Sequence, residues 1–239
     1  MVVAHSRPAR LLRPSSVRRG LATLGVMAVA LARDGVAAGE PPMDGTEILD
    51  LPAVSTGAVS LDDALRRRRS VRAFSPQPLS RKQLGQLCWA GQGITEAALG
   101  LRTAPSAGAR YPLELYVVLP SGVFHYEPRG HRLKRIDGAD ARGALARAGH
   151  GADPVRLAAA DIVVTAVVSR TRARYGDRAE RYAHLEAGHA AQNVLLEATA
   201  LGLAAVPVGA FEDDAVRRVI GASGDEAPLY ILAVGQPGS

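Results

Sequence analysis

Runs of consecutive apolar residues predict the strands of this protein. Four such runs cover 113–119, 161–169, 203–208 and 229–234. The runs 161–169 and 229–234 are apolar at most positions, which is typical of strands buried on both faces. Two weaker strands are expected around Phe124 and Leu133, joined by a turn at 128–130.

Apolar residues three or four positions apart predict helices in other parts of the chain. Ser60 followed by Asp63 resembles a capping box, which would open a short helix through Arg67. Ser80 is expected to cap a second helix. One face of that helix would carry Leu84, Leu87, Cys88 and Gly91.

A long helix is predicted from about Asp177 to Leu201, ended by Gly202. Its inner stripe is expected to include Leu185, Ala191, Leu195 and Ala198. The acids at 212–214 would start a last helix. Strands and helices without strict alternation favour an α+β layered domain.

Composition excludes several classes of protein. The 239 residues are 47% hydrophobic and 22% charged, so the chain is neither disordered nor collagen-like. A single cysteine, Cys88, excludes a disulfide framework and a cysteine-rich zinc site. This cysteine lies between Leu87 and Trp89 and is expected to be a buried apolar residue rather than a nucleophile.

The formal net charge of +6 is concentrated at the start of the chain. Six arginines and one aspartate lie within residues 1–38, which therefore carry a net charge of +5. Residues 39–239 carry a net charge of +1. A nearly neutral remainder without interleaved aromatic residues argues against binding to nucleic acid.

Residues 1–38 have the layout of a secretory signal peptide. An arginine-rich start precedes the apolar run 21–32, and cleavage is expected after Ala38. The pair Arg18-Arg19 indicates a twin-arginine signal. The alternatives are an ordinary secretion signal, or a translation start assigned too far upstream of a cytoplasmic protein. The run is too short for a stable membrane span. Localisation is therefore expected to be periplasmic or extracellular if the signal is used, and cytoplasmic otherwise.

Residues 39–59, rich in Pro, Gly and small residues, are predicted to be a linker.

Three segments of the remainder are candidates for ligand binding. The run 66–72 (RRRRSVR) could be a solvated helix face or an anion clamp, because guanidinium and hydroxyl groups suit phosphate. The loop 104–109 and the segment 205–211 could bring the backbone close to a flat ligand or simply be turns. No P-loop or dinucleotide-binding fingerprint is present.

The long helix contains polar residues that do not match a metal site. His184, Glu186 and His189 lack the spacing of a helical zinc protease, and no metal is expected. Gln192 and Asn193 are expected to satisfy hydrogen bonds in the core.

The order of these motifs resembles the nitroreductase family. It runs from Arg68-Arg69-Ser70-Val71-Arg72-Ala73-Phe74, through Pro105-Ser106-Ala107-Gly108 and Tyr111-Pro112-Leu113-Glu114-Leu115-Tyr116, to Glu186-Ala187-Gly188-His189 and the segment 202–211. More narrowly it is similar to the SagB/ThcOx-type FMN-dependent dehydrogenase branch, whose best-known members oxidise peptide thiazolines and oxazolines. The resemblance covers about residues 60–237 and makes 60–239 the FMN-binding domain.

The resemblance implies an α+β nitroreductase-like fold with a mixed sheet, and a homodimer that binds FMN at the subunit interface. The cofactor-binding residues would be Arg68, Arg69, Ser70 and Arg72 around the phosphate, ribityl chain and pyrimidine edge, Pro105, Ser106 and Gly108 along the flavin, and Pro207, Val208, Gly209 and Ala210 on its other side. The amide of Gly209 would point toward flavin N5. A cation such as Arg72 would stabilise the negative charge that hydride transfer leaves near N1 and C2=O.

The chain departs from the family pattern at two places. The C-terminal residues 235–239 (GQPGS) carry no cation, so the phosphate clamp would depend on the arginines before Ala73. Where azoline oxidases have a Lys-Tyr pair, this chain has Arg181-Tyr182, and arginine does not serve as a base as lysine does. Tyr182, with Arg181, remains the candidate acid or base, and a packing role for Tyr182 is the alternative.

The expected function is that of an FMN-dependent oxidoreductase that transfers a hydride between an organic substrate and flavin N5. The substrate would be a small molecule or a peptide. Export would remove the enzyme from NAD(P)H, which disfavours an NAD(P)H-dependent nitro or quinone reductase. A flavin- or ligand-binding module without turnover and a structural domain without flavin are the alternatives outside enzymes.

Overall fold

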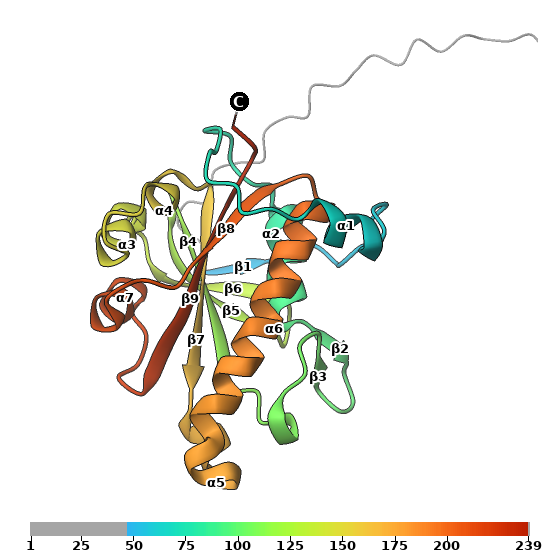
Figure 1. Ribbon diagram of the computed structural model, residues 1–239, viewed down its shortest axis with the longest axis vertical. Helices are drawn as coiled ribbons and strands as arrows, with labels where there is room; N and C mark the ends of the chain where they lie inside the picture. Colours follow the sequence, from blue (N-terminus) through green and yellow to red (C-terminus); the bar gives the residue numbers. More distant parts are fainter. Residues whose placement is uncertain (1–46, 239) are drawn as a thin grey trace, which may run out of the picture. The chain divides into compact units, whose positions relative to one another are not determined.

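The computed structural model describes residues 47–238, which form a seven-stranded sheet with helices on both faces (Figure 1). The strand order is β1-β6-β5-β4-β7-β9-β8. The bounds are Ile48–Asp50 (β1), Leu113–Leu119 (β4), Gly122–Glu127 (β5), Arg132–Asp137 (β6), Ala160–Val167 (β7), Ala204–Val208 (β8) and Glu226–Gly235 (β9). A separate hairpin pairs Ile94–Glu96 (β2) with Leu101–Arg102 (β3).

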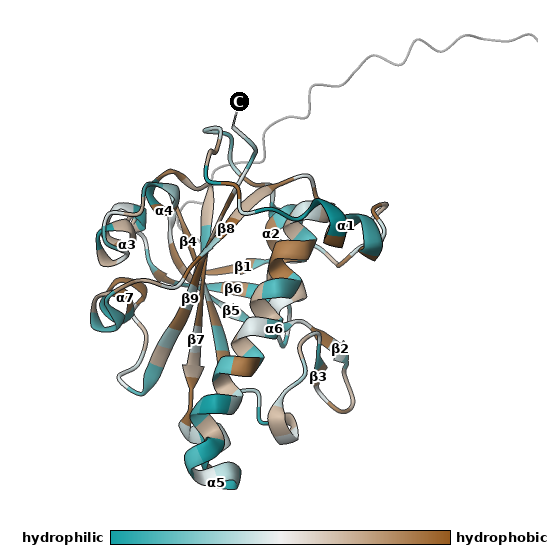
Figure 2. Cartoon of the chain, in the orientation of Figure 1, coloured by the Kyte–Doolittle hydropathy of each residue, from teal (hydrophilic) through white to brown (hydrophobic). Residues whose placement is uncertain are grey.

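Helices cover the sheet as two outer layers (Figures 1 and 2). Their bounds are Leu61–Arg67 (α1), Arg81–Gln92 (α2), Arg142–Ala148 (α3), Asp153–Leu157 (α4), Ser169–Tyr175 (α5), Ala179–Ala200 (α6) and Asp213–Ile220 (α7). One apolar core lies between the sheet and α2 with α6, and a second lies between the sheet and α3, α4 and α7. The predicted α+β layered fold is confirmed.

The continuous apolar runs arise because the central strands are buried on both faces. Leu115 and Val117 of β4 pack in the core under α2 and α6, whereas Tyr116 and Val118 pack in the opposite core. Successive side chains of a strand point to opposite faces, so both sets must be apolar. The prediction of buried strands is confirmed for β7 and β9 as well.

Every pair of neighbouring strands in the described sheet is antiparallel. A parallel contact is made at the edge, where Ser70 forms a bridge to Ala205 of β8. Pro207 lies in this same edge strand, where a residue without a backbone N–H is tolerated.

The predicted helix starts are confirmed. Ser60 Oγ accepts a hydrogen bond from the Asp63 amide, and Ser80 Oγ accepts one from the Gln83 amide. The full capping box belongs to α2, where the Gln83 side chain also accepts from the Ser80 amide. Cys88 is completely buried, and burial raises the pKa of its thiol to about 12, which agrees with an apolar role.

The inner stripe of α6 differs from the prediction at one position. Ala191, Leu195 and Ala198 are buried as expected, but Leu185 is 54% exposed. The buried stripe instead includes Ala183, Ala187, Ala190 and Val194. Small residues let this helix lie close to the sheet, so side-chain size, rather than hydropathy alone, decides which face turns inward.

The segment 39–59 is not only a linker. Strand β1, within it, pairs antiparallel with β6, and Leu49 and Leu51 are buried. The sheet domain therefore begins before Ser60. The sequence did not predict this strand, because three residues at a sheet edge do not form a long apolar run. The predicted signal peptide, residues 1–38, lies outside the described residues. In the described part of the chain no helix is long and apolar enough to cross a membrane.

Asp161 is a buried carboxyl in β7, and no group of residues 47–238 donates a hydrogen bond to it. Burial raises its pKa well above the usual value, although Arg142 opposes the shift. Because the unfolded chain ionises near pH 4 and the folded chain does so only at higher pH, stability falls as pH rises between these two values.

We expect Asp161→Asn to raise the melting temperature by a few degrees at pH 7, since about 1 kcal/mol shifts it by roughly 2–4 °C in a domain of this size. The gain should shrink below pH 4, where aspartate is protonated in both states. Thermal unfolding of both proteins at several pH values measures this difference. A gain that is independent of pH would contradict the raised pKa of Asp161.

Candidate functional site

The arginine run leaves α1 and passes along the edge of the sheet. Helix α1 ends at Arg67, and beyond it the Val71 amide donates a hydrogen bond to the Ala205 carbonyl at 2.9 Å. This contact fixes Arg68, Ser70 and Arg72 beside β8 although 135 residues separate Ser70 from Ala205. Two predicted groups, the arginine segment and the segment 207–210, therefore lie at one edge.

The C-terminal tail holds the same segment from the other side. The Ser75 amide donates to the Gln236 carbonyl and the Gly238 amide to the Ala73 carbonyl, each at 3.0 Å. A Cβ atom at Gly235 would lie 2.9 Å from Phe74 Cδ1, so glycine is needed there for Phe74 to pack. The tail that lacks a cation thus supports the arginine segment through its backbone.

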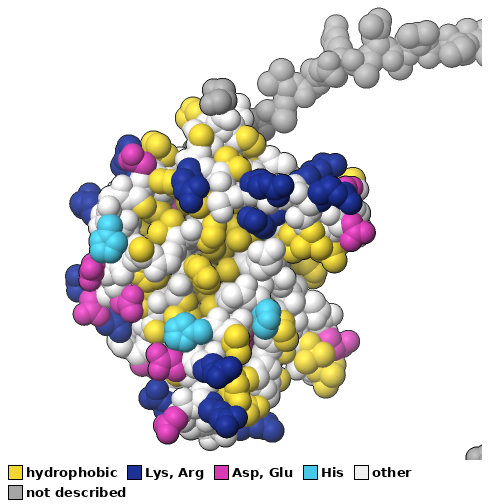
Figure 3. All heavy atoms as spheres, in the orientation of Figure 1, with side chains coloured by type: hydrophobic (Ala, Val, Ile, Leu, Met, Phe, Trp, Pro, Cys, Tyr) yellow, Lys and Arg dark blue, Asp and Glu magenta, His cyan; other side chains and the backbone are white. Residues whose placement is uncertain are grey.

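Three arginines of the run, Arg67 at the end of α1 and Arg68 and Arg72 beyond it, keep their guanidinium groups available. Arg66 is paired with Asp63 at 2.7 Å, and the side chain of Arg69 turns back to the carbonyls of Arg66 and Arg68. Within residues 47–238, Arg68 and Arg72 form no ion pair. Figure 3 shows basic side chains gathered along the upper part of this face, above a hollow lined by apolar side chains. This charge arrangement fits a phosphate.

Gly209 offers an amide to a ligand beside this cluster. Among the described hydrogen bonds none uses the Gly209 N–H, and the residue is exposed. A Cβ atom there would meet only Tyr230 Cε1, at 3.9 Å, so the fold itself does not require glycine. An open glycine amide at the end of an edge strand allows a flat ring to approach the backbone closely.

The loop with Pro105, Ser106 and Gly108 has a defined conformation of its own. Ser106 Oγ accepts a hydrogen bond from the Tyr111 amide at 2.8 Å. Gly108 has a φ of 59°, and a Cβ atom there would lie 2.7 Å from the Tyr175 hydroxyl. Glycine is therefore required at 108 by the fold, whatever the loop binds.

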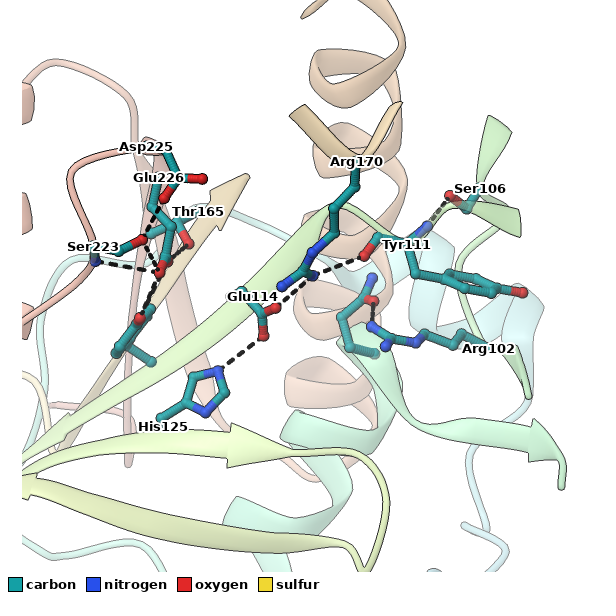
Figure 4. A network of polar contacts seen from close by, with 12 residues as sticks. Arg102, Ser106, Tyr111, Glu114, His125, Thr165, Arg170, Ser223, Asp225 and Glu226 are labelled. Atoms are coloured by element: carbon teal, nitrogen blue, oxygen red, sulfur yellow. Dashed lines mark hydrogen bonds and ion pairs between the residues drawn. The ribbon is translucent and has the colours of Figure 1, made fainter. Parts of the chain in front are cut away.

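A polar network anchors the strand that follows this loop (Figure 4). Glu114 of β4 contacts His125 at 2.8 Å and Arg170 at 2.5 Å, and Arg170 also donates to the Tyr111 carbonyl at 3.2 Å. Burial alone would raise the pKa of Glu114, but the bonds from His125 and Arg170 lower it below the usual value. The loop thus has a rigid base.

Arg102 and Glu186 complete the surroundings of the loop. Arg102 donates to Gln92 at 2.6 Å and lies over the Tyr111 ring, 4.7 Å from its centroid. Glu186 is buried, and burial raises its pKa to about 7, although a hydrogen bond from Ser106 and the charge of Arg102 act against the shift. Glu114 lies within the motif 111–116 but was given no role there, and Arg102 and Arg170 lie in none of the motifs. Their partners come from distant strands and helices, which a local pattern does not show.

Helix α6 separates the two groups of predicted residues within one chain. Tyr182 contacts Tyr175 edge-on at a centroid distance of 5.0 Å, on the side where Glu186 meets the loop. His184 lies two residues further, about 200° around the helix. It lines a pocket together with Gly209. A single chain therefore brings Arg68–Arg72 and 207–210 together, but leaves 105–108 and Tyr182 on another side.

The other residues predicted to act on α6 also lie away from the pocket at Gly209. Arg181 is exposed, and Tyr182 is not among the residues that line the pocket at Gly209. Asn193 donates to the Thr103 carbonyl at 3.3 Å, as expected of a residue that satisfies the core. Over residues 47–238, no three potential metal ligands come together.

The structure defines an α+β domain whose exposed cationic edge suits an enzyme that binds an anionic cofactor. A family model described as "Nitroreductase family" matches residues 65–236. The chain therefore belongs to the nitroreductase family, a family of FMN-dependent oxidoreductases. This confirms the predicted class of enzyme and its cofactor, FMN.

Individual relatives agree with this membership. A nitroreductase-type protein of Methanocaldococcus jannaschii is 38% identical over 200 residues, which cover 81% of this chain and 98% of the relative. The crystal structure of a nitroreductase-type protein from Ralstonia eutropha is 29% identical with a TM-score of 0.74, covering 81% of this chain and 91% of that one. A structure from Desulfovibrio desulfuricans in complex with FMN shares the fold at 23% identity and a TM-score of 0.57, covering 75% and 87% of the two chains.

Proposed function

We propose that the protein is a homodimeric, exported FMN-dependent dehydrogenase that oxidises a small organic molecule or a peptide. The observation that carries the proposal is the cationic edge near Gly209, where Arg68 and Arg72 have no carboxylate partner among the residues that the structure describes. When bound there, FMN would supply the acceptor for a hydride. The protein supplies the anion clamp, the backbone donor and the substrate pocket.

The division of the predicted residues by α6 supports the dimer. In one chain the clamp and 207–210 share an edge, while Pro105, Ser106 and Gly108 lie beyond the helix. Two cations near this loop are already engaged, since Arg102 donates to Gln92 and Arg170 pairs with Glu114. A second copy, related by a two-fold axis, would bring its loop to the first copy's clamp and receive the reciprocal contact. We propose that each FMN is held by both subunits.

The roles of the chain's own groups follow from charge and donor chemistry. Arg68 would neutralise the cofactor phosphate, and Arg72 would stabilise the negative charge that reduction leaves on the pyrimidine ring. Ser70 and the Gly209 amide would donate hydrogen bonds. The fixed loop at Ser106 would exclude water from the ring.

The motif order supports the SagB/ThcOx-type branch, but not azoline oxidation. Arg181 stands where a lysine would act as the base, and it is exposed on α6. The arginine-rich signal at 1–38 supports export, and an exported enzyme meets little NAD(P)H. A substrate that itself reduces the flavin fits this setting.

The test is the visible spectrum of the protein purified separately from periplasmic and cytoplasmic fractions, followed by anaerobic reduction. We expect a yellow periplasmic protein that NADPH bleaches slowly and that an organic substrate bleaches without nicotinamide. Rapid bleaching by NADPH with turnover of nitroaromatics or quinones would contradict the dehydrogenase and favour the reductase. A protein that takes up no added FMN would contradict both.

A further inference from the structure

A pocket of about 540 Å³ opens beside Gly209, on the side of α6 that faces β9 and α7. Its apolar wall includes Ala183, Phe211 and Pro228. This volume is typical of sites for small organic ligands. Because Gly209 belongs to both the pocket wall and the proposed flavin contact, a molecule in the pocket would lie beside the cofactor.

The polar groups of the pocket come from three helices. They are Arg172 of α5, Glu180 and His184 of α6, and Asp213 of α7. The residues that β9 contributes, 227–229, carry no charge. Of these groups, the imidazole is the one suited to accept and return a proton near neutral pH.

The structure fixes the tautomer of His184. Its Nδ1 lies 2.8 Å from the backbone carbonyl oxygen of Glu180, one helical turn earlier. A carbonyl oxygen only accepts hydrogen bonds, so Nδ1 must carry the hydrogen. In the neutral ring Nε2 then has a free lone pair, and the side chain is exposed at the pocket. The arrangement is that of a base held in one orientation by its own helix.

We infer that His184, rather than Tyr182, is the proton acceptor of the reaction, and that the substrate is an alcohol or amine oxidised at the carbon bearing the O–H or N–H group. This inference rests on the proposed function. In the oxidation the C–H bond breaks and its electron pair leaves as hydride, for which FMN is the oxidant. The O–H or N–H bond also breaks, its proton goes to His184 Nε2, and a C=O or C=N bond forms. In the reverse direction the same nitrogen returns the proton.

Tyr182, the other candidate for the proton acceptor, lies outside this pocket. Tyr182 is directed toward Tyr175, about 200° from His184 around α6, and does not line this pocket. Sequence reading rejected His184 as a metal ligand and did not consider it further. The hydrogen bond to the Glu180 carbonyl and the neighbourhood of Gly209 are visible only in the folded chain.

The test uses His184→Asn in the FMN-loaded protein. An asparagine amide can still donate to the Glu180 carbonyl but has no counterpart of Nε2. With benzyl alcohol and benzylamine as probes, mixed anaerobically with the oxidised flavoprotein, we expect flavin bleaching to slow about 100-fold, the size typical of a lost general acid or base. FMN affinity should stay within about twofold, because the clamp is untouched. Imidazole added to His184→Ala should restore part of the rate.

His150→Asn is the matched control, since His150 is an exposed histidine with a φ of 57°, which asparagine also adopts, and it does not line the pocket. A readout without turnover is the ¹H–¹⁵N NMR spectrum of the ring nitrogens, in which neutral His184 should carry its hydrogen on Nδ1. Flavin bleaching of His184→Asn at the wild-type rate, a wild-type protein bleached by neither probe, or a hydrogen on Nε2 would overturn the inference alone. A wild-type protein that binds no FMN would overturn the proposed function as well.

Discussion

Replacing Arg68 and Arg72 together by alanine should give a protein that is purified without flavin. Both guanidinium groups lie at the sheet edge without carboxylate partners, so their charges are available to a phosphate and to the flavin ring. A hydrogen bond to a charged group contributes about 1.5–3 kcal/mol, and two such losses amount to about 3–6 kcal/mol. The dissociation constant of FMN should therefore rise by a factor of roughly 100 to 20,000.

Fluorescence titration of the apoprotein with FMN measures this change, and thermal unfolding of the apoproteins shows whether the fold is kept. Arg66→Ala with Arg67→Ala is the matched control, because it removes two charges from the same run on α1, one of which is already paired with Asp63. Equal losses of affinity in the two double variants would show that only the general positive charge of the run matters. An unchanged affinity in Arg68→Ala with Arg72→Ala would refute the clamp.

Two variants that each lack flavin should regain it when they form a heterodimer. The first is the clamp variant, Arg68→Ala with Arg72→Ala. The second is Pro105→Trp, which puts a bulky ring at an exposed position of the loop that would line the flavin. If each site takes its clamp from one subunit and its loop from the other, a heterodimer has one site with both defects and one site with none.

Coexpression with two affinity tags isolates the heterodimer, and its flavin content is read from the visible spectrum. We expect about one FMN per heterodimer, against two in the wild-type dimer and close to none in either variant homodimer. A site built within one chain would leave every heterodimer colourless, because each chain would contain a defect. A Pro105→Trp homodimer that still binds FMN would show that this loop is not part of the FMN site.

Local patterns along the chain were sufficient to predict most of the fold. The strands 113–119 and 204–208 and the helices that begin after Ser60 and Ser80 follow from apolar runs and capping residues, which act over a few positions. Helices α3 and α4 were not predicted, because they are short and have no such signal. The prediction of the inward face of α6 was partly wrong. The alanines that let this helix approach the sheet differ little in hydropathy from their neighbours, so the pattern did not mark them.

The sequence by itself determined the family, the class of enzyme, the cofactor and the arginine run that suits a phosphate, since these depend on residue types in a fixed order. Only the tertiary structure decided which of the predicted site residues lie close together in space. The bridge from Ser70 to Ala205 brings the arginines to Gly209, and the turn of α6 places Tyr182 and His184 on opposite sides. Contacts between residues more than a hundred positions apart depend on how the sheet and helices pack, and no local pattern records them.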